Sequence, residues 1–308
     1  MDWLKVFVWY PALMLFFFIS GFLFFREHTF SRELYIQKLK HRASSLLVPY
    51  LLWNGMALLS IAIIQTLRPG FSLFLNKQIA DFRWFDFLLV FWDKQAVTSQ
   101  ADDPHGPLLL QFWFIQSLIV VALFTPILWH GIKRLSWLFP VILGILLFIS
   151  LPAVAGFKAE AFFYFTLGAC FQLSGLWQKT VERPVLWSAV AIVMMLISIS
   201  VPVFQVFYNM AFFLTVFGAA HIVACNSGRI ANTFSRLSGA SFFIFALHIF
   251  FSGAFPHLIS LLNISWNSGL ALITYAIVVT LNVCCCLILQ QTVKRLTPTL
   301  YALMSGNR

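Results

Sequence analysis

The sequence predicts an all-α fold, a polytopic membrane helix bundle of about nine transmembrane helices. Of its 308 residues, 61% are hydrophobic and only 10% are charged, whereas soluble domains carry about 25% charged residues. The apolar residues are concentrated in long windows. Since about 20 apolar residues cross the hydrocarbon core of a bilayer, the composition indicates a protein whose partner is the lipid bilayer.

Nine windows contain no Asp, Glu, Lys or Arg and are long enough, or nearly long enough, to span a membrane. We expect the first to be a retained helix, because Arg26 follows it without the small-residue cleavage pattern of a signal peptide. No hydrophilic stretch is long enough for a soluble domain, so residues 1–308 are predicted to form a single integral-membrane domain. The windows are 6–25, 46–66, 107–129, 135–152, 161–177, 185–201, 205–224, 241–262 and 268–290.

The Lys and Arg residues are divided unequally between the two sides of this predicted bundle. Fourteen of the 20 fall in one set of alternate loops and six in the other. Cytoplasmic loops carry the excess of positive charge. We therefore expect the C-terminus of the chain in the cytoplasm and its N-terminus on the outer side of the membrane.

The longest predicted outer segment, residues 68–106, mixes aromatic and charged residues between Phe82 and Trp92. This composition is typical of a helix that lies in the headgroup region. A loop folded over the mouth of the bundle fits equally well, and both interpretations stay open.

The first predicted cytoplasmic loop carries a basic cluster made of Lys38, Lys40, His41 and Arg42. A basic cluster at the cytoplasmic surface can bind anionic lipid headgroups. It can also bind the phosphates of a cofactor such as coenzyme A, because ammonium and guanidinium groups pair well with phosphate. A third possibility is that these charges only mark the cytoplasmic side.

Few polar residues interrupt the apolar windows. Gln111, Gln116 and Ser117 lie near the outer end of the third window, and His248 lies in the middle of the eighth. Polar groups at membrane depth are costly and tend to face the bundle interior, where they either satisfy hydrogen bonds or line a substrate cavity. A histidine there could relay a proton near neutral pH or could be a satisfied bundle residue. His105, between Pro104 and Gly106, is expected to be a loop residue.

The remaining patterns mainly indicate which kinds of site the chain lacks. The small pair Ser20–Gly21 predicts close helix packing. Four of the five cysteines lie inside apolar windows without the spacing of a zinc site, so we expect no disulfide framework and no metal. We also expect no nucleic-acid partner. The residues show no Ser/His/Asp pattern and no glycine-rich phosphate loop, so they do not single out a reaction.

Four segments in this order resemble the acyltransferase-3 family of bacterial inner-membrane O-acyltransferases, over almost the whole chain. They are Leu15–Phe24, Lys38–Trp53, Gln111–Ile115 and Ser241–His248. The resemblance implies a ten-helix core that moves an acyl group, commonly acetyl from acetyl-CoA on the cytoplasmic side, to a hydroxyl of a sugar. The acceptor would be a surface polysaccharide, a glycolipid or a secondary metabolite.

The chain departs from the family pattern at its start. The family's first helix typically carries an Arg and, about eleven residues later, a His taken to be the catalytic base; here Met1 directly precedes what resembles the second helix. One helix fewer than ten agrees with the nine windows and with an N-terminus in the periplasm. Three interpretations follow, in order of preference: a misplaced start or a fragment of an active protein, a truncated and inactive relative, or a different role such as moving a lipid-linked glycan.

Our first hypothesis is a membrane O-acyltransferase that uses acetyl-CoA or another acyl-CoA as the donor and acts on a carbohydrate acceptor. The second is a transporter or exporter of a glycan that performs no chemistry. In the first, the donor would bind at the basic cluster Lys38, Lys40, His41 and Arg42, the acceptor cavity would be lined by Trp113, Gln116 and Ser241, and His248 is the catalytic candidate.

Overall fold

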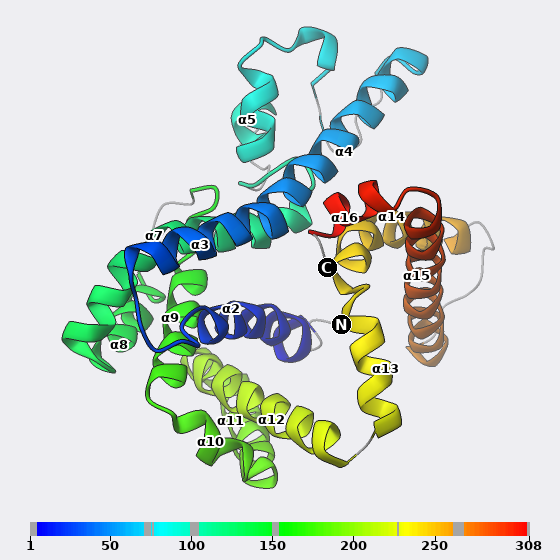
Figure 1. Cartoon of the computed structure of the whole chain (residues 1–308). Helices are drawn as coiled ribbons and strands as arrows, with labels where there is room; N and C mark the ends of the chain where they lie inside the picture. Colours follow the sequence, from blue (N-terminus) through cyan, green and yellow to red (C-terminus); the bar gives the residue numbers. More distant parts are fainter. Residues whose placement is uncertain are drawn as a thin grey trace. The chain divides into compact units, whose positions relative to one another are not determined.

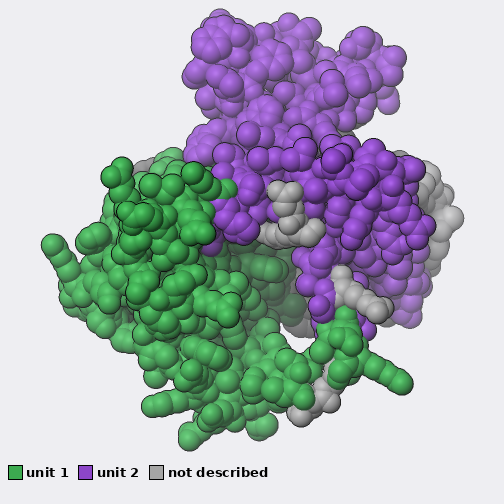
Figure 2. Space-filling model, viewed as in Figure 1, with its two compact units in different colours: residues 1–40, 114–232 green, residues 41–113, 233–308 purple. Residues whose placement is uncertain are grey.

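A computed structural model describes residues 5–70, 75, 77–98, 105–149, 154–226, 228–260 and 268–306. Within these ranges the regular elements are helices, together with an isolated antiparallel bridge between Val154 and Phe157, which confirms the all-α prediction. The chain divides into two compact units, each made of two separated segments (Figure 2). Unit 1 comprises residues 1–40 and 114–232, and unit 2 comprises residues 41–113 and 233–308. The single-domain organisation stays a prediction.

Each of the nine predicted windows overlaps a helix in its described part, as expected if backbone polar groups in lipid must be satisfied within the segment. Five described helices are long and apolar enough to cross a membrane, and two shorter apolar ones cover Pro184–Ser200 and Ser241–Ser252. Helix α8, with nine residues, is far shorter than the roughly 20 residues that span a bilayer. The number nine therefore stays a prediction. The five long helices are Lys5–Phe24, Arg32–Leu67, Leu110–Leu135, Gln205–Cys225 and Ile273–Leu296.

Unit 1 is built around helix α2, against which α9 and α12 pack (Figure 1). A short π-helix, η1, leads into α2, and its carbonyl groups are bound by α12: the Tyr208 hydroxyl donates to the Phe7 carbonyl at 2.5 Å and Gln205 Nε2 donates to the Val6 carbonyl at 3.0 Å. The elements are η1 (Lys5–Trp9), α2 (Tyr10–Phe24), α3 (Arg32–Arg42), α7 (Trp113–Leu135), α8 (Leu138–Leu146), α9 (Ala159–Leu173), α10 (Leu176–Val181), α11 (Pro184–Ser200), η5 (Pro202–Phe204) and α12 (Gln205–Asn226).

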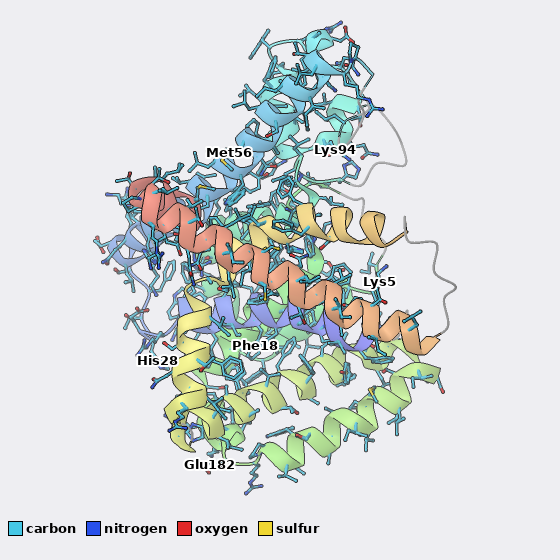
Figure 3. All side chains as sticks on the ribbon, turned by 90° about the vertical axis from the view of Figure 1, so that its right-hand side faces the viewer. Lys5, Phe18, His28, Met56, Lys94 and Glu182 are labelled. Carbon is cyan, nitrogen blue, oxygen red and sulfur yellow. The ribbon has the colours of Figure 1, made fainter. Side chains whose placement is uncertain are left out.

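Helices α2 and α9 touch backbone to backbone at two glycines. A Cβ atom added to Gly21 would lie 1.9 Å from the Phe165 carbonyl oxygen, and one added to Gly168 would lie 2.0 Å from the Phe18 carbonyl oxygen. Gly21 thus faces the carbonyl three residues before Gly168, and Gly168 faces the carbonyl three residues before Gly21. Phe18 itself is buried in unit 1 (Figure 3). The structure confirms that Gly21 serves close helix packing.

Unit 2 is built around α4, with the C-terminal helix α16 packed on it. Trp53 Nε1 donates to the Met304 carbonyl at 3.1 Å, and Gln290 Nε2 donates to the Tyr301 hydroxyl at 2.8 Å. The elements are η2 (Ala43–Leu47), α4 (Val48–Leu67), η3 (Ile79–Asp81), α5 (Asp86–Trp92), α6 (Lys94–Thr98), η4 (Leu110–Phe112), α13 (Gly228–Ser238), α14 (Ser241–Ser260), α15 (Ser268–Leu296) and α16 (Pro298–Ser305). The first residues of α13 belong to unit 1, and the last two of α3 belong to unit 2.

The structure shifts two predicted boundaries. The basic loop is helical, so a continuous helical run from Arg32 to Leu67 replaces the window 46–66. Regular helix α7 begins at Trp113 rather than at residue 107, after a 3₁₀ turn. The helix is interrupted at Leu109, whose backbone is extended (φ −84°, ψ 98°). Its N–H donates to Oδ1 of Asn54 on α4 at 2.9 Å, and Asn54 Nδ2 donates to the Tyr50 carbonyl at 2.9 Å. Both Asn54 and Leu109 are fully buried.

Replacing either crossing glycine by alanine is expected to destabilise the protein. A methyl group under 2.5 Å from a backbone oxygen forces the two helices apart, and such overpacking costs up to about 3 kcal/mol. Thermal unfolding in detergent of Gly21→Ala and Gly168→Ala checks this. Gly228→Ala is the matched control, since a Cβ there meets no atom within 4 Å. Unchanged melting of both crossing variants would contradict the close contact.

Asn54→Leu is expected to lower the free energy of unfolding by about 1–3 kcal/mol, because it leaves the buried Leu109 N–H without its acceptor. The same change at Asn232, which is exposed on α13, is the control. Chemical denaturation of both variants in the same detergent measures the difference. Equal stability of the two would mean that the Asn54 bond does not hold this segment.

Candidate functional site

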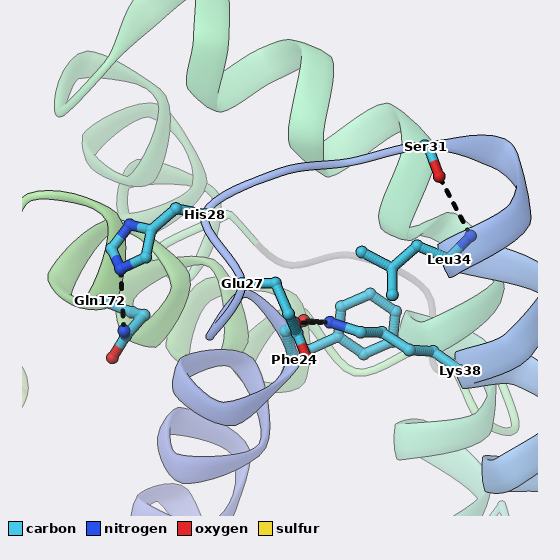
Figure 4. Close-up of polar contacts among 7 residues, drawn as sticks. All are labelled: Phe24, Glu27, His28, Ser31, Leu34, Lys38 and Gln172. Atoms are coloured by element: carbon cyan, nitrogen blue, oxygen red, sulfur yellow. Dashed lines mark hydrogen bonds and ion pairs between the residues drawn. The ribbon is translucent and has the colours of Figure 1, made fainter.

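The basic cluster lies on helix α3, and its first lysine is already paired within unit 1. Lys38 Nζ donates to the Glu27 carboxylate and to the Phe24 carbonyl at the end of α2, and lies 5.0 Å from the centre of the Phe24 ring (Figure 4). The hydrogen bond from Lys38 holds the pKa of the Glu27 carboxyl below its usual range. Lys38 therefore ties α3 to α2, and its side chain is only 17% exposed.

Two further groups close the turn between α2 and α3. Gln172 Nε2 on α9 donates to His28 Nε2 at 3.3 Å, and the Ser31 hydroxyl accepts from the Leu34 backbone N–H at 3.1 Å, next to the start of α3 (Figure 4). His28 adopts a positive φ of 56° in this turn. The beginning of α3 is therefore held by short polar contacts.

The remaining cations of the cluster follow Lys38 along the same helix. Lys40 and His41 are exposed, and Arg42 is half-buried at the end of α3. The π-helical turn η2 follows directly, and π-helical turns of this kind are frequent at functional sites. Exposed cations on one helix can receive the oxygens of an anionic ligand.

In unit 2, η4 packs against α14 close to His248. Gln111 Nε2 donates to the Ala246 carbonyl at 3.3 Å, and the Phe112 and Phe245 ring centres lie 5.5 Å apart. Gln111 lies in the 3₁₀ turn η4, whereas Gln116 lies in helix α7. The regular spacing of an α-helix therefore does not determine whether the two side chains point in the same direction. Gln111 Oε1 is buried and has no hydrogen-bond partner among the described residues.

His248 is half-buried in the middle of α14. Its Nδ1 lies 2.7 Å from the Phe245 carbonyl, which can only accept, so Nδ1 carries the proton and Nε2 keeps its lone pair. The His248 carbonyl accepts from Asn282 Nδ2 on α15 at 2.9 Å. Asn282 is not among the residues predicted for the site, although an amide inside an apolar helix is a visible signal in the sequence. Nε2 of His248 is thus free to take and return a proton.

The predicted substrate-lining residues do not gather in one place within either unit. Ser241 is exposed at the start of α14, where its hydroxyl donates to the Ser238 carbonyl at 2.7 Å. It lies two helical turns, roughly 10 Å, from His248. Trp113, half-buried, belongs to unit 2, whereas Gln116 is fully buried in unit 1. Their roles stay predictions.

A resident metal receives no support from the described part of the chain. No group of three or more His, Cys, Asp or Glu side chains within it could hold a metal ion. All five cysteines are described, and each has a free thiol.

Comparison with known proteins gives two matches. A family model described as an acyltransferase domain matches residues 3–290. The chain is also 27% identical, over 331 aligned residues, to the succinoglycan biosynthesis protein ExoH of Rhizobium meliloti (strain 1021). That alignment covers 100% of this chain and 83% of the relative. No solved structure matches.

These matches extend over nearly the whole chain and agree with its apolar helices, which make it a multi-pass membrane protein. The expectation of a further helix before the first window stays a prediction. The chain belongs to the acyltransferase-3 family of membrane O-acyltransferases.

Proposed function

We propose that this protein transfers an acetyl group from acetyl-CoA to a sugar hydroxyl of a surface polysaccharide or glycolipid at the bacterial inner membrane. The observation that carries the proposal is the full-length similarity to a protein of succinoglycan biosynthesis, which names a polysaccharide as the material on which that relative's pathway works. The family supplies the acyl-transfer reaction. This chain supplies exposed cationic side chains for the donor phosphates and an imidazole for proton transfer.

The donor binds at the cytoplasmic surface. Coenzyme A carries several phosphate charges, and Lys40 and His41 expose donors on α3 beside Arg42. The excess of Lys and Arg supports a cytoplasmic position for this helix and for the C-terminus, with the N-terminus of the chain in the periplasm. Lys38, bound to Glu27, sets the direction of α3 and stands next to these cations.

Trp113, Gln116 and Ser241 stay the proposed acceptor residues, Trp113 and Ser241 within unit 2 and Gln116 within unit 1. His248 relays a proton through its Nε2, because Nδ1 is held by the Phe245 carbonyl. A positioned imidazole that exchanges protons near neutral pH lowers the barrier of ester formation.

The direct test is transfer by the purified full chain in proteoliposomes with labelled acetyl-CoA and a polysaccharide acceptor. We expect an alkali-labile acetyl ester on the polysaccharide and a turnover about 100-fold lower in His248→Gln. Transport of a labelled lipid-linked glycan without ester formation would replace the proposal by the transporter hypothesis. Neither ester nor transport would indicate an inactive relative.

The donor position is tested by Lys40→Gln. We expect the KM for acetyl-CoA to rise by at least about tenfold, because a hydrogen bond to a charged group contributes about 1.5–3 kcal/mol. Lys5→Gln is the matched control, since Lys5 is exposed and predicted on the opposite side. An equal KM in both variants would remove the cluster from the donor site.

A further inference from the structure

The predicted outer segment of unit 2 contains a histidine held by a carboxylate. His105 Nδ1 lies 2.8 Å from Asp93 Oδ2, and the side chains are 33% and 17% exposed. An ionised carboxylate only accepts hydrogen bonds, so Nδ1 carries the proton and Nε2 keeps its lone pair. Nε2 has no partner among the residues that the structure describes, and the exposure of the ring leaves it within reach of a ligand.

Both members of the pair are held in place. The second oxygen of Asp93, Oδ1, accepts from the Gln95 backbone N–H at 3.2 Å, which fixes the carboxylate at the start of α6. The segment is closed by a backbone hydrogen bond from Lys94 N–H to the Gly106 carbonyl at 2.7 Å (Lys94 is labelled in Figure 3). The imidazole therefore has a defined direction.

The segment is anchored to the helices of unit 2 beside a predicted substrate residue. The Leu108 N–H donates to the Val90 carbonyl at 3.1 Å, and the next residue, Leu109, is held by Asn54. A Cβ added to Gly106 would lie 3.7 Å from Trp113 Cβ, so the backbone next to His105 lies against Trp113. Trp113 and a carboxylate-oriented imidazole thus lie in the same part of unit 2.

We propose that Asp93 and His105 form the acid–base pair that takes the proton from the acceptor hydroxyl, an inference that rests on the proposed acyl transfer. The hydroxyl oxygen forms the ester bond with the acyl carbon, and the carbon–sulfur bond of the thioester breaks. The hydroxyl proton passes to His105 Nε2 and from there to solvent, and the leaving thiolate takes a proton from solvent. Asp93 keeps the ring in place through Nδ1, and His248 is the relay through which the solvent proton reaches the thiolate.

The test compares His105→Asn with the wild-type full chain in the proteoliposome assay. Asparagine can still donate to Asp93, so the segment stays closed, but it has no basic nitrogen. We expect kcat to fall by about 100-fold or more with the KM for acetyl-CoA unchanged. We also expect added imidazole to restore part of the turnover of His105→Ala. The control is His130→Gln, an exposed histidine on α7 whose Nδ1 contacts only the Pro126 carbonyl among the described residues.

The possible outcomes separate the two proposals. If the wild-type chain forms no ester, the proposed function fails and the acid–base pair with it. If the wild-type chain forms ester and His105→Asn matches its kcat, only the pair is overturned. A loss of activity in His105→Ala that imidazole does not reverse, together with normal turnover of His105→Asn, would show that His105 only closes the segment.

Discussion

The backbone contact between α2 and α9 is the constraint on which unit 1 depends. Two helices without glycine at the crossing pack with their axes about 8–10 Å apart, whereas Gly21 and Gly168 let each backbone reach the carbonyl of the other. Lipid provides no hydrophobic force between helices, so this close packing supplies much of the attraction. Three residues after Gly21, α2 ends at Phe24, whose carbonyl accepts a hydrogen bond from Lys38, as does the Glu27 carboxylate. Lys38 thus ties the basic helix to the helix that makes the glycine contact.

In unit 2 the corresponding constraint is a buried polar contact. The regular helix α7 does not begin at Pro107: Leu109 has an extended backbone, with φ −84° and ψ 98°, and its N–H donates to Asn54, which lies 55 residues away. A buried amide that satisfies a backbone group in this way is specific, since displacing it leaves two groups unpaired. The bond holds Leu109 directly before η4, from which Gln111 donates to the Ala246 carbonyl of α14.

The sequence predicts the helices well and their ends less well. Apolar windows mark lipid-crossing helices because the bilayer imposes the same requirement on every one of them. The helical run from Arg32 was missed because it is polar, so that hydropathy gives no signal there. The start of α7 and the pairing of Asp93 with His105 depend on contacts across loops, where no periodicity exists to reveal them. Of the candidate site, the basic cluster and His248 could be found from residue type alone, but their hydrogen-bond partners could not.

The two histidines of the proposals differ in the group that binds the imidazole Nδ1. Residue type alone cannot reveal this difference. Both His248 and His105 use Nδ1 for a hydrogen bond and keep the lone pair on Nε2. Nδ1 of His248 faces a backbone carbonyl of its own helix, on Phe245, at 2.7 Å. Nδ1 of His105 faces a side-chain carboxylate, on Asp93, at 2.8 Å. The two rings therefore share a tautomer and differ in the group that orients them, and only His105 has the carboxylate partner that a general base of the His–Asp type requires.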